Sequence, residues 1–179
     1  PWEVHTSPHD IPGYEEELFP VAETEIGNIG AAICYDWLFP ESIRQLAMNG
    51  AEVMVRVSAY MDPFGATAPN DWWTVVNRCR ALENQAYVVA ANQGASLQNY
   101  PPFSWPGGSI IVDHDGRIVA QATPGSGEKI TVGPVDVSML RHEREHRKAH
   151  HMLSQLRTEA HKGYGEPVFA GGWFRERDD

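Results

Sequence analysis

Lysine is scarce in this sequence, with three among 179 residues, at Lys129, Lys148 and Lys162. The formal net charge is -10 at pH 7, which argues against a nucleic-acid partner because phosphate backbones bind basic surfaces. No apolar run approaches the roughly 20 residues of a membrane-spanning helix. The two cysteines, Cys34 and Cys79, form neither a disulfide framework nor a CxxC metal pair. Since no signal peptide is recognisable, we expect a reducing cytoplasm.

The chain begins at Pro1-Trp2-Glu3 without a methionine, and we expect an upstream segment to be missing. Hydrophobic residues make up 42% and charged residues 21% of the chain, which is ordinary for a globular protein. A chain of this length suffices for one domain with a sizeable core.

A short apolar run, Ile29 to Ile33, stops abruptly at Cys34, and Pro40-Glu41 then opens a helical pattern. This order predicts a buried strand, a sharp turn and a helix start. A cysteine on such a turn is held at the lip of a pocket, where a covalent catalyst would place its nucleophile.

Strand and helix patterns alternate through the first half of the chain, which predicts βαβ units and an α/β fold. The loop at 59–70 leaves the same sheet edge as the Cys34 turn, because both follow strand ends. The predicted strands are 21–25, 29–34, 51–58, 86–92, 109–113, 117–122 and 128–135, with turns at Gly27-Asn28 and His114-Asp115-Gly116, and the predicted helices are 40–48, 71–84 and 137–161.

Several residues allow a structural and a functional interpretation. Cys79 recurs with apolar residues at helical spacing, so we expect it in the core rather than at a site. His142, His146 and His150 fall on one helical face, which favours a solvated or subunit-contacting surface over a metal site; a metal would need a further ligand that the sequence does not mark. Apolar residues in the C-terminal tail at 166–179 predict that it docks on the domain or on a neighbouring subunit.

Four stretches together resemble the nitrilase superfamily, the carbon–nitrogen hydrolases. The match runs over about residues 1–165, which we expect to be the hydrolase domain, and it is closest to the aliphatic amidase branch. The stretches are Ile33-Cys34-Tyr35-Asp36 with Phe39-Pro40-Glu41, Asn49-Gly50-Ala51-Glu52, Arg80 to Asn92, and Gly107-Gly108-Ser109 with Asp115-Gly116-Arg117-Ile118.

The resemblance implies an α-β-β-α sandwich and amide hydrolysis through a cysteine thioester, without a metal or other cofactor. Cys34 matches the family's nucleophile, and the backbone N–H of Tyr35 matches an oxyanion donor. The family's base glutamate and its lysine precede the cysteine, whereas every lysine here follows it. The chain therefore resembles the C-terminal part of the family domain, and alone it should expose a sheet face. The missing N-terminal part would come from the same or another chain.

Trp2, Trp37 and Tyr60 match or adjoin positions that line small-amide sites in the family, and core packing is the alternative for each. We expect Asp36 to act through turn bonds. Arg80 and Glu83 should pair or satisfy backbone groups near the turn rather than do chemistry.

The predicted function is hydrolysis of a small-molecule amide to a carboxylic acid and ammonia or an amine, by a homo-oligomer. Two alternatives stay open: nitrile hydrolysis on the same fold, and a non-catalytic fragment or interaction half, which the absence of the glutamate and lysine would explain.

Overall fold

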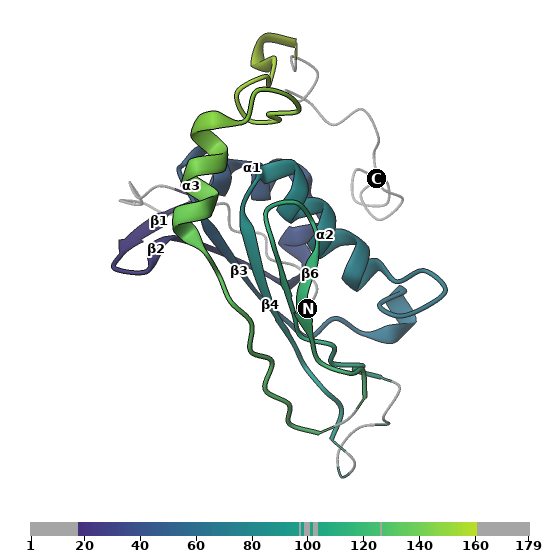
Figure 1. Ribbon diagram of the computed structural model, residues 1–179. Helices are drawn as coiled ribbons and strands as arrows, with labels where there is room; N and C mark the ends of the chain where they lie inside the picture. The colour runs from purple at the N-terminus through teal and green to yellow at the C-terminus, as the bar shows by residue number, and fades with distance from the viewer. Residues whose placement is uncertain (1–17, 97, 99–100, 102–103, 126, 161–179) are drawn as a thin grey trace, which may run out of the picture.

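The computed structural model describes residues 18–96, 98, 101, 104–125 and 127–160. Their core is one six-stranded sheet in the order β1-β2-β3-β4-β5-β6, with α1 and α2 beside it and α3 at the other side (Figure 1). The strands are β1 Val21–Thr24, β2 Gly27–Ile33, β3 Val53–Ser58, β4 Tyr87–Asn92, β5 Ile110–Val112 and β6 Ile118–Gln121, and the helices are α1 Pro40–Met48, α2 Trp72–Asn84 and α3 Val137–His146, with short 3-10 turns at Cys34–Leu38, Asp62–Phe64 and Thr158–Ala160.

The two predicted βαβ units are confirmed. Strands β2, β3 and β4 are parallel neighbours, joined by α1 and α2, while the other pairs are antiparallel. In the pairing register, Ile33 lies opposite Val57, and Val57 opposite Ala91. The carboxyl ends of all three parallel strands therefore meet at one sheet edge, which is where ligands bind in open α/β sheets.

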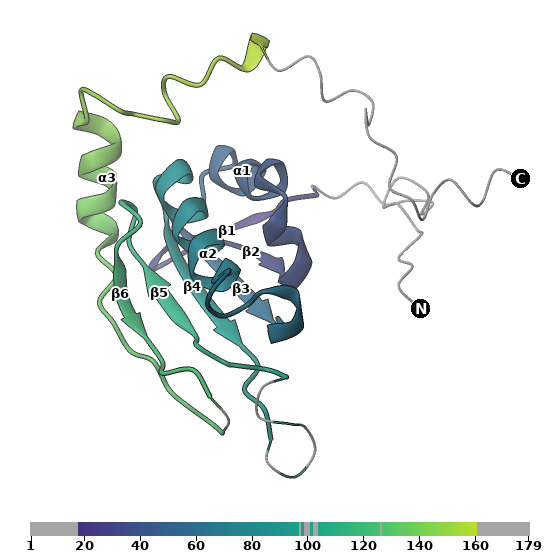
Figure 2. The same cartoon turned by 90° about the vertical axis from the view of Figure 1, so that its right-hand side faces the viewer.

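Helices α1 and α2 pack on one face of the sheet (Figure 2). Because side chains alternate along a strand, Met54 and Arg56 of β3 point to this face and are fully buried. Ile43 and Leu46 of α1 belong to the same core cluster as Met54. The amphipathic pattern of α1 predicted this face correctly.

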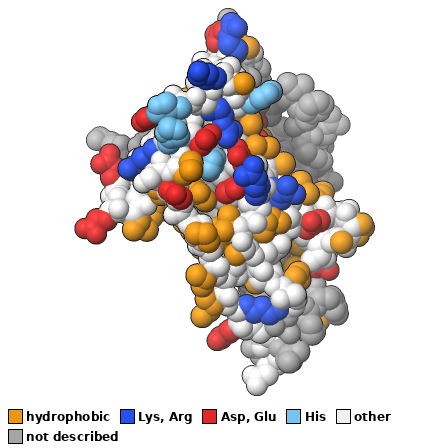
Figure 3. Space-filling model, viewed as in Figure 1, with side chains coloured by type: hydrophobic (Ala, Val, Ile, Leu, Met, Phe, Trp, Pro, Cys, Tyr) orange, Lys and Arg blue, Asp and Glu red, His pale blue; other side chains and the backbone are white. Residues whose placement is uncertain are grey.

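Among the described residues, α3 covers the opposite face at the amino ends of β3 and β4. There α3 places Leu140 against Val53 of β3 and Tyr87 of β4. At the carboxyl ends, Val57 is 49% and Ile33 64% exposed. Figure 3 shows hydrophobic side chains gathered below the charged and histidine side chains of the α3 region. The pairing row Ile33, Val57 and Ala91 lies at the carboxyl ends of the parallel strands, and we call this row the open face.

Two arginines of α3 bind the helix to the sheet through an ion pair and hydrogen bonds. Arg141 forms a two-bonded ion pair with the buried carboxylate of Glu52, at 2.6 and 2.9 Å, and Glu52 also accepts the Asn28 backbone N–H at 2.8 Å. Arg144 donates to the carbonyls of Ala51 and Gln85. The side-chain hydrogen bond from Arg141 lowers the pKa of Glu52, so this carboxylate is charged at neutral pH.

Five sequence expectations are wrong. Residues 128–135 are extended but form no strand, and α3 ends at His146 instead of about 161. His142 and His146 stack with ring centroids 4.2 Å apart, while His150 lies beyond the helix, so the three do not share a helical face. The β1–β2 turn is Glu25-Ile26, since Gly27 already pairs with Thr24 in the ladder.

The fifth concerns Cys79, which is exposed rather than in the core. Helix α2 turns the polar residues Asn77, Arg80 and Asn84 toward the sheet together with Trp73. The apolar periodicity containing Cys79 therefore lies on the outer face, where Val75 is 50% exposed. Within the described residues, no helix has the length and apolar character needed to cross a membrane.

Candidate active site

Cys34 is the first residue after β2, the second strand of the sheet, and opens a 3-10 turn that ends at Leu38. Its backbone φ is +46°, in the left-handed region that a residue with a Cβ rarely adopts. Holding a residue there costs about 1–3 kcal/mol and requires support from its surroundings. The Cys34 side chain is free and partly exposed at the sheet edge.

Side chains of the turn itself and of α2 hold this turn. The Asp36 carboxylate accepts the backbone N–H of Ile33 at 3.0 Å, as its predicted turn role requires. The Trp37 indole N–H donates to the carbonyl of Ala32 at 3.0 Å. Arg80 of α2 donates to the carbonyls of Trp37 and Leu38 at 3.0 and 3.2 Å. The turn is therefore anchored to the strand before it and again at its own last two residues.

Arg80 is itself held by an ion pair with Glu83 at 2.9 Å. Its guanidinium satisfies backbone carbonyls of the turn, which confirms the expectation that Arg80 and Glu83 are structural.

A second buried arginine reaches Cys34 itself. Arg56 of β3 donates from Nη2 to the carbonyl of Cys34 and from Nη1 to Asn77 Oδ1, both at 3.2 Å. Its guanidinium carbon lies 4.5 Å from the ring centroid of Trp73, 5.5 Å from that of Tyr60 and 5.6 Å from that of Trp37. Burial lowers the pKa of Arg56 to about 10, against the opposing influence of Cys34 and Tyr60, so it remains charged at neutral pH.

The loop after β3 is tied to the end of β4 by Asn92. The Asn92 side chain accepts the Tyr60 N–H at 2.7 Å and donates to the carbonyls of Tyr60 and Gly107 at 3.2 and 3.0 Å. One amide thus joins the loops that follow β3 and β4 beside the Cys34 turn, at the edge where the sequence placed the site.

The predicted substrate-contacting aromatics differ in their surroundings. Trp37 is fully buried and packs in the core, so it forms no open wall here. Tyr60 is 5% exposed and its hydroxyl donates to the Phe64 carbonyl at 3.1 Å; burial raises its pKa. Core packing, the alternative for both, describes their contacts in this structure. Trp2 lies outside the described residues.

The Tyr35 ring is 64% exposed and packs edge-on against Phe39, with centroids 5.3 Å apart. Among the described residues, none accepts a hydrogen bond from the Tyr35 backbone N–H. A free donor next to a partly exposed thiol is what an oxyanion site needs.

Sequence reasoning missed the roles of Arg56 and Asn92. One signal was available for Arg56: a charged side chain interrupts the apolar run Val53 to Val57. Such a residue in a central parallel strand must be buried, and a buried charge needs partners. The sequence did not say that one partner is the Cys34 carbonyl.

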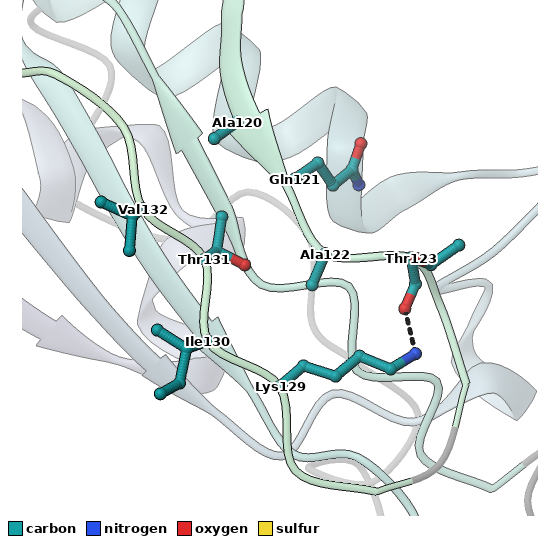
Figure 4. A pocket seen from close by; sticks show the side chains of 8 residues that line it. All are labelled: Ala120, Gln121, Ala122, Thr123, Lys129, Ile130, Thr131 and Val132. Carbon is teal, nitrogen blue, oxygen red and sulfur yellow. Dashed lines mark hydrogen bonds between the residues drawn. The ribbon is translucent and has the colours of Figure 1, made fainter.

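A hollow on the surface lies away from this site, between β6 and the segment at 129–132 (Figure 4). Lys129 lies across it and donates to the carbonyl of Thr123 at 2.6 Å. Strands β3, β4 and β5 separate it from Cys34. In the part of the chain that the structure describes, no group of three or more His, Cys, Asp or Glu side chains is arranged to hold a metal ion.

Comparison with known proteins identifies the family. The carbon-nitrogen hydrolase family model matches residues 2–145, and this chain belongs to that family, within the nitrilase superfamily. The C. elegans NitFhit protein has the same fold, with a TM-score of 0.67 and 32% identity over 81% of this chain and 32% of its own.

Two curated relatives carry amidase names. Deaminated glutathione amidase of Rattus norvegicus is 36% identical over 80% of this chain and 41% of its own length. Omega-amidase NIT3 of Saccharomyces cerevisiae is 34% identical over 76% of this chain and 48% of its own. The chain thus spans less than half the length of these relatives.

Proposed function

We propose that this chain carries the nucleophile of an enzyme that hydrolyses a non-peptide amide through a thioester at Cys34. The observation that supports it best is the Cys34 turn. A partly exposed thiol in a supported left-handed conformation follows the parallel strand β2, beside a Tyr35 N–H that no described residue uses. The relatives' names, deaminated glutathione amidase and omega-amidase, favour an amide as substrate.

In the proposed reaction the Cys34 thiol loses its proton to a base, and Sγ attacks the amide carbonyl carbon. The carbonyl oxygen becomes an oxyanion that the Tyr35 N–H stabilises. Collapse of this intermediate breaks the carbon–nitrogen bond, and the base returns the proton to the departing ammonia or amine. Water then attacks the thioester, releasing the carboxylic acid and restoring the thiol.

The base and the ammonium group of the family's site come, in this proposal, from residues outside these 179. The open face supports this view, because apolar side chains beside Cys34 are left exposed where a second sheet layer of the sandwich would pack. A layer placed there would bring its own side chains over the Cys34 turn. We propose that residues 1–165 are the part of the domain that this chain supplies, and that the enzyme is a cytoplasmic homo-oligomer.

Replacing Cys34 tests the proposal in the complete protein. We expect Cys34→Ala to reduce ammonia release from small amides by at least about 10⁴-fold, since it removes the nucleophile on which both steps depend. Cys79→Ala is the matched control, because Cys79 is exposed on α2, and it should retain full turnover.

Undiminished turnover by Cys34→Ala would contradict the proposal. A panel pairing each amide with its nitrile separates the two reactions of this fold: faster turnover of the nitriles would favour nitrile hydrolysis. A complete protein that turns over neither would favour the non-catalytic alternative.

A further inference from the structure

The peptide unit between Cys34 and Tyr35 has a contact at its carbonyl end that bears on its N–H end. Arg56 Nη2 donates to the Cys34 carbonyl at 3.2 Å. Arg56 lies on the helix-covered face of β3 and is fully buried. The Cys34 carbonyl is therefore directed toward the interior between the sheet and α2.

A peptide unit is planar and trans, so its C=O and N–H point in opposite directions. Fixing the Cys34 carbonyl toward Arg56 thereby fixes the Tyr35 N–H away from the helix-covered interior. This orientation aims the donor out of the core, next to the partly exposed thiol. Rotation of the peptide plane would break the Arg56 hydrogen bond as it moved the N–H.

A cationic donor on the carbonyl also changes the strength of the N–H. Hydrogen bonds in series polarise one another, more so where the surroundings are poorly polarisable. Arg56 is enclosed by the rings of Trp37, Tyr60 and Trp73, away from water. Its charge therefore draws electron density toward the Cys34 oxygen and makes the Tyr35 N–H a better donor to an oxyanion.

Burying an arginine is costly, and the structure does not compensate it fully. Arg56 Nε has no hydrogen-bond partner among the described residues, and its other two nitrogens serve Asn77 and Cys34. A structure selected for stability alone could fill the site with an apolar side chain.

We propose that Arg56 is a positioning residue for catalysis: it sets the plane of the Cys34–Tyr35 peptide and strengthens the Tyr35 N–H as the oxyanion donor. This inference rests on the proposed function of Cys34. It assigns Arg56 an effect on the reaction through the peptide, without contact with substrate.

The first experiment observes the peptide directly. Labelling the complete protein with ¹³C-carbonyl cysteine and ¹⁵N tyrosine selects Cys-Tyr peptides, of which this chain has one. We expect the Tyr35 ¹⁵N signal to move upfield in Arg56→Met and to move less in Arg56→Lys, which keeps the charge. Arg80→Lys is the matched control, since Arg80 holds Trp37 and Leu38 in the same turn but not this peptide; its signal should stay in place.

The second experiment separates the oxyanion donor from the thiol. Iodoacetamide alkylates a thiolate by displacement and forms no oxyanion, whereas amide hydrolysis needs the donor. The rate constant of alkylation is measured on its high-pH plateau, where the thiol is fully ionised. Arg56→Met should change this rate constant by less than about threefold. The same variant should lower kcat/KM for an amide by about 10- to 100-fold. That loss is smaller than the 10²–10³ of deleting an oxyanion donor outright. Arg56→Lys should recover part of it, and Arg80→Lys should change hydrolysis and alkylation in parallel.

An unmoved Tyr35 signal in Arg56→Met would overturn the proposal, as would equal losses in hydrolysis and alkylation, which would mean that Arg56 only supports the fold. An active wild type with an equally active Arg56→Met contradicts this inference alone. A complete protein that hydrolyses no amide, or a Cys34→Ala variant that still does, contradicts the proposed function and this inference together.

Discussion

The face of the sheet under α1 and α2 and the open face differ in the chemistry of their side chains. The covered face buries the charged side chain of Arg56 and receives Asn77, Arg80 and Asn84 from α2. The open face leaves Ile33 and Val57 in contact with solvent. Polar groups inside and apolar groups outside reverse the usual distribution.

Each reversal has its own explanation. Arg56 and Arg80 satisfy carbonyls of the Cys34–Leu38 turn, which purely apolar side chains would leave without donors. The exposed apolar groups indicate a surface that is covered in the complete protein. The comparison teaches that buried polar side chains of the covered face support the Cys34 turn, while the exposed apolar side chains of the open face form a surface suited to packing.

The largest expected effect comes from charging the open face. In the complete protein, Val57→Asp should lower the free energy of unfolding by about 3–5 kcal/mol, because a covering layer would bury an unpaired carboxylate. Urea unfolding measures this loss. Ile26→Asp is the control, at a turn residue that is 73% exposed, and it should stay within about 0.5 kcal/mol. Equal free energies of unfolding for Val57→Asp and wild type would show that this face stays exposed to solvent in the complete protein.

A smaller effect is expected where α3 covers the amino end of the open side. Glu52→Gln removes the ion pair with Arg141 and should cost about 2 kcal/mol at pH 7, as hydrogen bonds to charged groups do. Arg157→Gln is the control, because its pair with Glu159 is exposed on both sides and such pairs contribute about 0–1 kcal/mol.

The same pair predicts a pH dependence. Arg141 holds the pKa of Glu52 below its ordinary value of 4.5. The stabilisation is therefore complete above that value and is lost as the pH falls through the lower folded-state pKa. Unfolding curves from pH 7 downward should converge for wild type and Glu52→Gln, and a constant difference at all pH values would contradict this account.

The smallest effect is expected on the outer face of α2. Cys79→Ser should change the free energy of unfolding by less than about 0.5 kcal/mol, because the thiol is exposed and makes no core contact. A loss near 2 kcal/mol would mean that this face is buried in the complete protein.

Much of the fold followed from local patterns. The turn glycines and the apolar runs were enough to predict α1, α2 and the parallel strands to within about two residues. The prediction failed in 128–135, where alternating apolar residues do not pair with a neighbouring strand. It also failed after His146, where helical spacing continues but no apolar helix face packs on the sheet. In both places tertiary contacts, which local spacing does not carry, decide the outcome.

Part of the candidate site could likewise be predicted from the sequence, and part could not. The sequence by itself determined where the Cys34 turn lies, because a strand that ends at Cys34 before Pro40-Glu41 leaves only a sharp turn between them. It also determined that Arg80 and Glu83 support this turn.

Only the tertiary structure decided which side of α2 faces the sheet, that Trp37 is in the core, and that Arg56 reaches the Cys34 carbonyl. These depend on side chains 22 residues or more apart in the chain meeting in space. The physical reason is that a buried hydrogen bond is chosen by which donors and acceptors the packed elements enclose together, and that enclosure exists only after the sheet and its helices have assembled.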